Sequence, residues 1–171
     1  MKYKGPVLLV LIAIGIATMF FIPEQKKYEK IIAVGQPAPA FEYADSTGKV
    51  WKMSELKGKV VFINFWATWC TTCKAEMPQK ALINKKMEGK PFQMLGILFR
   101  DDPSNLPQYF RNNKVTAPTL ISPGNEAGKI FGITGVPETF IIDKDGILRE
   151  RLIGPQVWDS EESVALIEKW L

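Results

Sequence analysis

The sequence predicts an α/β fold with a central mixed sheet flanked by helices. Two observations support it: strongly apolar strand-like runs alternate with helical segments, and an Asp-Gly turn at 145–146 joins two more strands as a terminal hairpin. The chain has 171 residues, of which 46% are hydrophobic and 23% charged. That length suffices for one globular domain with a core, plus a short extra segment.

The elements begin after a polar connector at 24–36. Residues 41–53 hold two short strand-like runs around a Ser-Thr-Gly turn, which predicts an N-terminal β-hairpin. Residues 59–66, KVVFINFW, are almost continuously apolar, as expected of a strand buried on both faces. The later elements are expected to be a helix at 70–88, a strand at 91–99, helices at 103–112 and 125–131, the terminal hairpin, and a helix at 158–171. We expect Pro78 to kink its helix and Asp159 to cap the last one.

The first 23 residues predict a membrane anchor. This prediction divides the chain into an anchor at 1–23, a linker at 24–36 and a domain at 37–171. Residues 5–23 carry no charge, and as a helix they would span roughly 28 Å, close to the hydrocarbon thickness of a bilayer. A cleaved signal peptide and a buried core helix are the alternatives, although the small residues of a cleavage site do not follow the apolar run. We expect the domain on the extracytoplasmic side of the cell (inner) membrane.

Composition excludes several function classes. The chain carries a net charge of +4, but the first 30 residues hold five lysines against two glutamates, so the rest is nearly neutral and offers no surface for nucleic acid. The chain has no histidine, which removes His-dependent nucleophiles, bases and metal sites. Two cysteines cannot supply the ligands that zinc needs. No metal and no cofactor is expected.

The only two cysteines, Cys70 and Cys73, stand at the junction of a buried strand and a helix. The unpaired N–H groups and the positive dipole at a helix start stabilise a thiolate, so Cys70 is the expected nucleophile and Cys73 the resolving thiol. A structural disulfide is the alternative. It is less favoured because a bridge across two residues closes too short a loop to gain much stability.

NFWATWCTTCKAEMP at 64–78, followed by GVPETFIIDKDG at 135–146, resembles the membrane-anchored thioredoxin-like proteins of the TlpA, ResA and CcmG (DsbE) type. The resemblance runs from about Val34 to the C-terminus, and the acidic pair after Arg100 is closest to the CcmG branch. It implies a thioredoxin-like fold and thiol-disulfide oxidoreductase activity. It also implies that Pro137 is a cis-proline facing the cysteines, which leaves the backbone of Val136 free to pair with substrate.

Two acids are carried over by the resemblance. Glu76, one helical turn after Cys73, is expected beside the active site, where a carboxylate raises the pKa of a thiol and can move protons. Glu138, directly after Pro137, is expected to contact substrate. For both residues a solvent-facing glutamate is the alternative.

Four further positions bear on specificity. Asn64 stands where thioredoxin has a buried proton-shuttling aspartate, so a general base must come from Glu76, Glu138 or water. Thr71 and Thr72 add no charge between the cysteines, which predicts a reducing protein, because strong oxidants of this fold carry a histidine there. Trp69 is expected either to pack at the rim of the core or to contact the partner protein.

The resemblance implies reduction of protein disulfides in cytochrome c maturation. The substrate would be the Cys-x-x-Cys-His disulfide of apocytochrome c, or an assembly factor carrying it. Electrons would come from a membrane thiol transporter of the CcdA or DsbD kind, and residues 5–23 would hold the protein in the lipid bilayer. A general envelope exchange protein, a thiol peroxidase, and a binding module with inert cysteines are the alternatives. The chain lacks the Pro-x-x-x-Thr-x-x-Cys motif of a thiol peroxidase, because Ile63 and Ala67 occupy the positions of the proline and the threonine.

Overall fold

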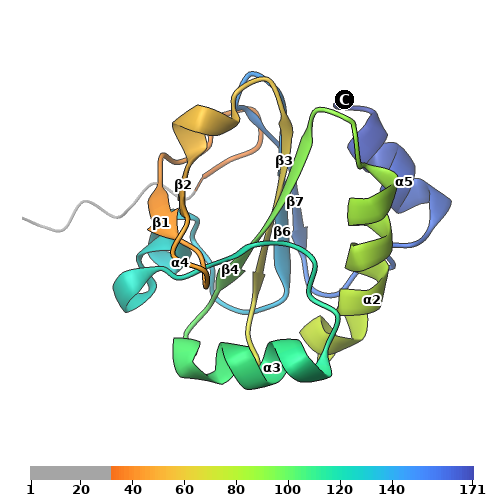
Figure 1. The fold of residues 1–171 in the computed structure, drawn as a ribbon. Helices are drawn as coiled ribbons and strands as arrows, with labels where there is room; N and C mark the ends of the chain where they lie inside the picture. The colour runs from red at the N-terminus through yellow and green to blue at the C-terminus, as the bar shows by residue number, and fades with distance from the viewer. Residues whose placement is uncertain (1–31) are drawn as a thin grey trace, which may run out of the picture. The chain divides into compact units, whose positions relative to one another are not determined.

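A computed structural model describes residues 32–171 (Figure 1). The anchor predicted at 1–23 and most of the linker predicted at 24–36 lie outside these residues. Within the described part of the chain, no helix has both the length and the apolar character needed to cross a bilayer.

The centre of the fold is a five-stranded sheet in the order β5-β4-β3-β6-β7. Strands β3 and β4 are parallel, as are β4 and β5, whereas β6 runs antiparallel to both β3 and β7. The bounds are β3 Val60–Trp66, β4 Phe92–Leu98, β5 Thr119–Leu120, β6 Glu138–Ile142 and β7 Leu148–Ile153. The sheet is therefore mixed, as predicted.

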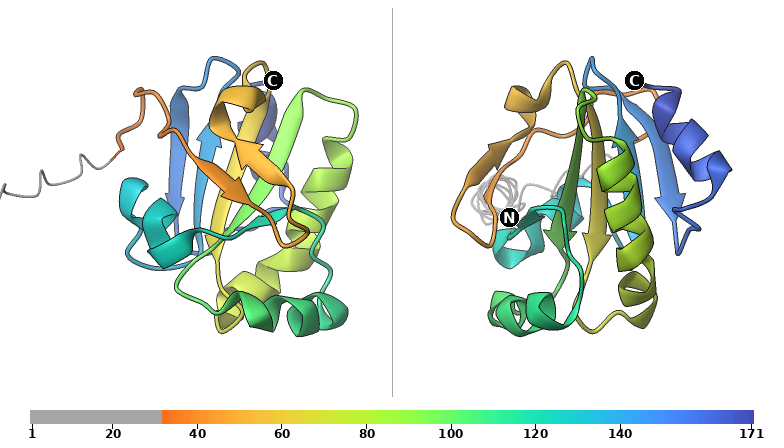
Figure 2. Two further views of the ribbon diagram at one scale, coloured as in Figure 1. Left: turned by 60° about the vertical axis from the view of Figure 1, so that its left-hand side comes forward. Right: turned by 45° about the vertical axis from the view of Figure 1, so that its right-hand side comes forward.

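Each face of the sheet is covered by different elements (Figure 2). Helices α2 and α5 pack on one face, and α4 with the hairpin β1–β2 packs on the other. Helix α3 lies at the carboxyl ends of β3 and β4 (Figure 1). The bounds are β1 Glu42–Ala44, β2 Val50–Lys52, α2 Thr71–Lys86, α3 Leu106–Asn112, α4 Glu126–Ile130 and α5 Glu161–Glu168, with 3-10 turns η1 Met53–Leu56, η2 Pro103–Asn105 and η3 Pro123–Asn125.

Every residue of β3 is buried, which explains its continuous apolar sequence. Because side chains alternate along a strand, Ile63 and Phe65 join the core beneath α4 and the hairpin, while Phe62 joins the core beneath α2 and α5. The ring of Phe62 meets that of Trp158 edge-on, with 4.8 Å between centroids. Strand β3 thus fixes both layers, and the chain that leaves its carboxyl end enters α2 directly.

The last helix departs from its expected start and cap, and one strand was not predicted. The last helix spans Glu161–Glu168, and its cap is Ser160, whose Oγ accepts a hydrogen bond from the Ser163 N–H. Asp159 precedes that cap, so it does not fill the predicted role. Strand β5 was not predicted, because two residues flanked by prolines in TAPTLISP give no periodic pattern. Pro78 lies inside α2, which continues past it.

Gly96 on β4 provides space for the buried indole of Trp66. A Cβ atom at this position would lie 2.7 Å from Trp66 Nε1 and 3.2 Å from its Cδ1. The indole is packed against Tyr109 with 5.0 Å between ring centroids, so it has little room to move.

We expect Gly96→Ala to lower the free energy of unfolding by about 1–3 kcal/mol, because the added methyl group overpacks a filled core. Urea denaturation followed by tryptophan fluorescence measures this. Gly135→Ala is the matched control, since a Cβ atom there meets nothing within 4 Å. Equal stability of the two variants would contradict the packing argument.

Candidate functional site

The site is built at the junction of β3 and α2. The chain leaves β3 at Trp66, and α2 begins at Thr71 with Cys70 as its N-cap. The Cys70 Sγ accepts a hydrogen bond from the Cys73 N–H at 3.1 Å. A sulfur at this point faces the free N–H groups of the first helical turn, which favour negative charge on it. Cys70 and Cys73 form a disulfide in this structure.

The two sulfurs lie in different surroundings. Cys73 is completely buried, whereas Cys70 is 5% exposed and is flanked by Trp69, which is 59% exposed. Thr72 Oγ1 lies 3.5 Å and the carbonyl oxygen of Val136 3.8 Å from Cys70 Sγ. A partner protein therefore meets Cys70 first, and Cys73 works from inside the protein.

The loop between α4 and β6 brings the start of the second predicted motif, at 135–146, to the cysteines. The peptide bond between Val136 and Pro137 is cis. The Val136 carbonyl faces Cys70, as the distance above shows, and Pro137 O accepts a hydrogen bond from the Gly154 N–H. Trp69, Thr71 and Thr72 are exposed around the same point, while Val136 is half-buried.

Asp101, which follows β4, holds the active-site loop. Its carboxylate accepts hydrogen bonds from the N–H groups of Thr68 and Asp102 and from the Asn105 side chain. Burial acts to raise the pKa of Asp101, but these hydrogen bonds outweigh it and hold the pKa below the usual range. Trp69 Nε1 donates to the carbonyl of Arg100, so the same segment also positions the exposed indole. Sequence reasoning noted the acidic pair only as part of the resemblance and assigned it no role.

Glu76 is 4% exposed, which excludes the solvent-facing alternative. Its Oε1 accepts hydrogen bonds from the Gln156 N–H at 2.7 Å and from Trp158 Nε1 at 3.0 Å. Its Oε2 accepts one from Lys80 Nζ at 2.8 Å. The carboxylate therefore lies on the buried face of α2, one turn beyond Cys73, and is fixed there by three donors.

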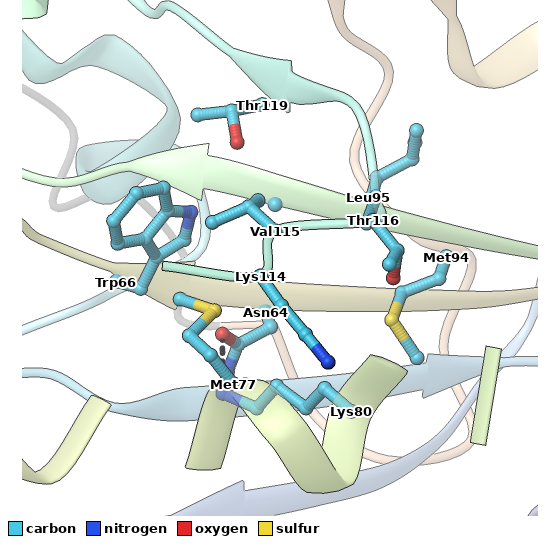
Figure 3. Close-up of a pocket in the computed structure, with 12 residues that line it drawn as sticks. Asn64, Trp66, Met77, Lys80, Met94, Leu95, Lys114, Val115, Thr116 and Thr119 are labelled. Carbon is cyan, nitrogen blue, oxygen red and sulfur yellow. Dashed lines mark hydrogen bonds between the residues drawn. The ribbon is translucent and has the colours of Figure 1, made fainter. Parts of the chain in front are cut away.

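Lys80 is a site residue that sequence reasoning missed. Its side chain is buried, and its Nζ donates to Glu76 and also to Asn64 Oδ1 at 2.8 Å (Figure 3). Burial lowers the pKa of Lys80, and the neighbouring Glu76 carboxylate opposes that effect. Lys80 also lines a cavity of about 20 Å³ beside Asn64 and Thr119. The available clue was its spacing, four residues after Glu76 and seven after Cys73, which places all three on one helix face.

The structure does not bring the carboxylate of Glu138 to the cysteines. Glu138 pairs in register with Phe65, whose side chain lies on the face away from α2, and it accepts a hydrogen bond from Arg151 Nε at 2.6 Å. It is buried, so the solvent-facing alternative was wrong for this residue as well. Burial raises the pKa of Glu138, and Arg151 opposes the shift.

Known proteins are similar to this chain in sequence and in fold. The redoxin family matches residues 33–166. The thiol-disulfide oxidoreductase ResA of Bacillus anthracis is 31% identical over 143 residues, covering 84% of this chain and 80% of ResA. The thiol:disulfide interchange protein DsbE of Yersinia pestis is 34% identical over 137 residues, covering 75% of this chain and 70% of DsbE. A thioredoxin-family thiol:disulfide interchange protein from Chlorobium tepidum superposes with a TM-score of 0.70 at 26% identity, covering 81% of this chain and 98% of that structure.

The chain belongs to the redoxin family. Within it, the protein is a thiol-disulfide oxidoreductase of the ResA and DsbE type, and its Cys-x-x-Cys pair forms the disulfide that such activity requires. The thioredoxin-like fold that the resemblance implied is confirmed. Thiol-disulfide oxidoreductases act on disulfide-containing proteins.

We expect Asp101→Ala to loosen the active-site loop of this redoxin. It should lower the free energy of unfolding by about 1 kcal/mol at pH 7, since charge-assisted hydrogen bonds to a partly exposed carboxylate are lost. Because the pKa of Asp101 is depressed in the folded protein, its contribution is present above the unfolded pKa and is lost as pH falls through the folded one. Urea denaturation at pH 7 and at pH 3 should therefore show the gap between variant and parent closing in acid. Asp159→Ala removes the same charge at an exposed position and serves as control; a gap of constant size would refute this role.

Proposed function

We propose that this redoxin is an extracytoplasmic, membrane-anchored reductase of protein disulfides that acts in cytochrome c maturation. The observation that carries the proposal is the position of Cys70 at the start of α2, with its Sγ 3.8 Å from the carbonyl oxygen of Val136 and with Glu76 buried on the same helix. The substrate class is the Cys-x-x-Cys-His disulfide of apocytochrome c or of an assembly factor that carries it. The resemblance of residues 64–78 and 135–146 to the cytochrome-maturation proteins supports this choice.

Reduction proceeds by two thiol–disulfide exchanges. The Cys70 thiolate attacks one sulfur of the substrate disulfide; a Cys70–substrate bond forms, the substrate S–S bond breaks, and the departing thiolate takes up a proton. Cys73 then loses its proton and attacks Cys70; the internal disulfide forms and the second substrate thiol is released. The substrate gains two electrons and the enzyme loses two. A membrane thiol transporter of the CcdA or DsbD kind returns the enzyme to its reduced form.

The geometry favours Cys70 as the attacking sulfur. It lies beside exposed Trp69 and a half-buried Val136 backbone, where an extended substrate segment can approach. Cys73, which is completely buried, can reach only Cys70 Sγ, and it attacks that sulfur once Cys70 is bound to the substrate. The uncharged Thr71 and Thr72 between the cysteines support a reducing rather than an oxidising role.

We expect Cys73→Ser to trap the first exchange as a covalent complex. With the resolving thiol removed, a peptide carrying an oxidised Cys-x-x-Cys-His motif should remain bound to Cys70 and appear as a mass increase under non-reducing conditions. Cys70→Ser should form no such adduct.

In cells, deletion of the protein should lower the amount of mature cytochrome c, and residues 1–23 should be needed to recover it in the membrane fraction. If the peptide adduct forms but cytochromes assemble normally, general envelope thiol exchange replaces the proposed role. If neither an adduct nor an assembly defect is found, the inert-cysteine binding module remains.

A further inference from the structure

Helix α2 presents one buried face that carries three ionisable groups in sequence: Cys73, Glu76 and Lys80. Residues spaced by three, four and seven positions lie along the same side of a helix. Lysine is almost never fully buried unless it is paired, and here the pair is complete, with Lys80 Nζ 2.8 Å from Glu76 Oε2. The second partner is Asn64, on the central strand β3. Neither partner lies at the surface.

We propose that Lys80 is a positioning residue for the resolving step, acting on Cys73 through Glu76. It holds the Glu76 carboxylate on the buried face of α2 and balances its charge, so that Cys73 ionises next to a neutral pair instead of next to an unopposed anion. This inference requires only thiol–disulfide exchange and does not depend on cytochrome maturation.

The charge balance follows from the exchange itself. Before resolution, Cys73 is a neutral thiol and the Glu76–Lys80 pair has no net charge. When Cys73 transfers its proton to the Glu76 carboxylate, the thiolate is negative, Glu76 is neutral and Lys80 is positive, so the buried site still has no net charge. The thiolate then attacks Cys70 and the Cys70–substrate bond breaks. Glu76 releases its proton to solvent as the departing substrate thiolate takes one up, which restores the neutral Glu76–Lys80 pair. Without the lysine, the same site carries a negative charge throughout.

Apart from Lys114, the other groups around the pair carry no charge. Strand β3 contributes the uncharged Asn64, and the loop after β7 contributes the Gln156 N–H and the Trp158 indole. Segment 114–119 contributes Lys114 at the exposed edge of the small cavity and the Thr119 hydroxyl inside it. On β6, Thr139 faces Asn64, while the charged Glu138 lies on the opposite face with Arg151.

The test measures the ionisation of Cys73 directly. In a Cys70→Ala background Cys73 is the only cysteine, because the chain has two, and thiolate absorbance against pH gives its midpoint. Lys80→Met should raise the midpoint by about one pH unit, since an unopposed carboxylate disfavours a second negative charge. At a fixed pH below the midpoint, a rise of one unit lowers the fraction of Cys73 present as thiolate about tenfold. Lys86→Met removes an exposed lysine of the same helix and should leave the midpoint unchanged.

A second series of variants tests the proposal even if Lys80→Met alone does not fold. Glu76→Gln, which leaves Lys80 unopposed, should lower the midpoint. Adding Lys80→Met to Glu76→Gln should then raise it again, toward the parent value, in a protein whose buried pair has been replaced on both sides. Lys80→Arg keeps the charge and should keep the midpoint. Equal midpoints for Lys80→Met and the parent, or for Glu76→Gln with and without Lys80→Met, would overturn the proposal. Because no substrate enters the measurement, neither result depends on which protein the enzyme reduces.

Discussion

The buried carboxylate of Glu76 connects two segments that are far apart in the sequence. It joins the catalytic helix α2 to the loop after β7 through the Gln156 N–H, and to the aromatic core through Trp158, which packs on Phe62 of the central strand. Lys80 completes the set from within the helix. A buried ion pair gains little net stability, because desolvation offsets most of its attraction, but breaking it from one side costs about 3–5 kcal/mol. The arrangement therefore holds α2 in place against the C-terminal segment rather than adding much to overall stability.

This constraint explains why the two cysteines differ. The backbone at the start of α2 controls Cys70, since free N–H groups and the helix dipole act only within the first turn. Cys73 also lies in that turn, but its side chain is buried, so side chains on the buried face of the helix act on it as well. Fixing α2 through Glu76 thus fixes the environment of both sulfurs at once. The segment that holds Asp101 constrains the loop before Cys70, because it binds Thr68 just after β3 and sets where the exposed Trp69 lies.

The fold and the cysteines were predictable from the sequence because their patterns are local. Continuous apolar runs gave β3 and β4, the Asp-Gly turn gave the hairpin of β6 and β7, and the spacing of the cysteines at a strand–helix junction gave the redox site. The side of the sheet on which Glu138 lies depends on strand register, which adjacency to Pro137 does not reveal. Lys80 was missed for a related reason: a lysine on a helix is usually at the surface. Only the tertiary contact with Asn64 shows that it is inside.

Asn64 links these observations. Its Oδ1 accepts a hydrogen bond from Lys80 Nζ on α2, and its Nδ2 donates one to Thr139 Oγ1 on β6. An aspartate at this position, as in thioredoxin, would offer no donor to Thr139 and would add a second carboxylate to a site that holds one buried cation. Two anions would then share Lys80, and each buried carboxylate would be left partly unpaired. In this protein the buried carboxylate is therefore that of Glu76 on helix α2, one turn from Cys73. Strand β3 supplies only the neutral amide of Asn64, which accepts a hydrogen bond from Lys80.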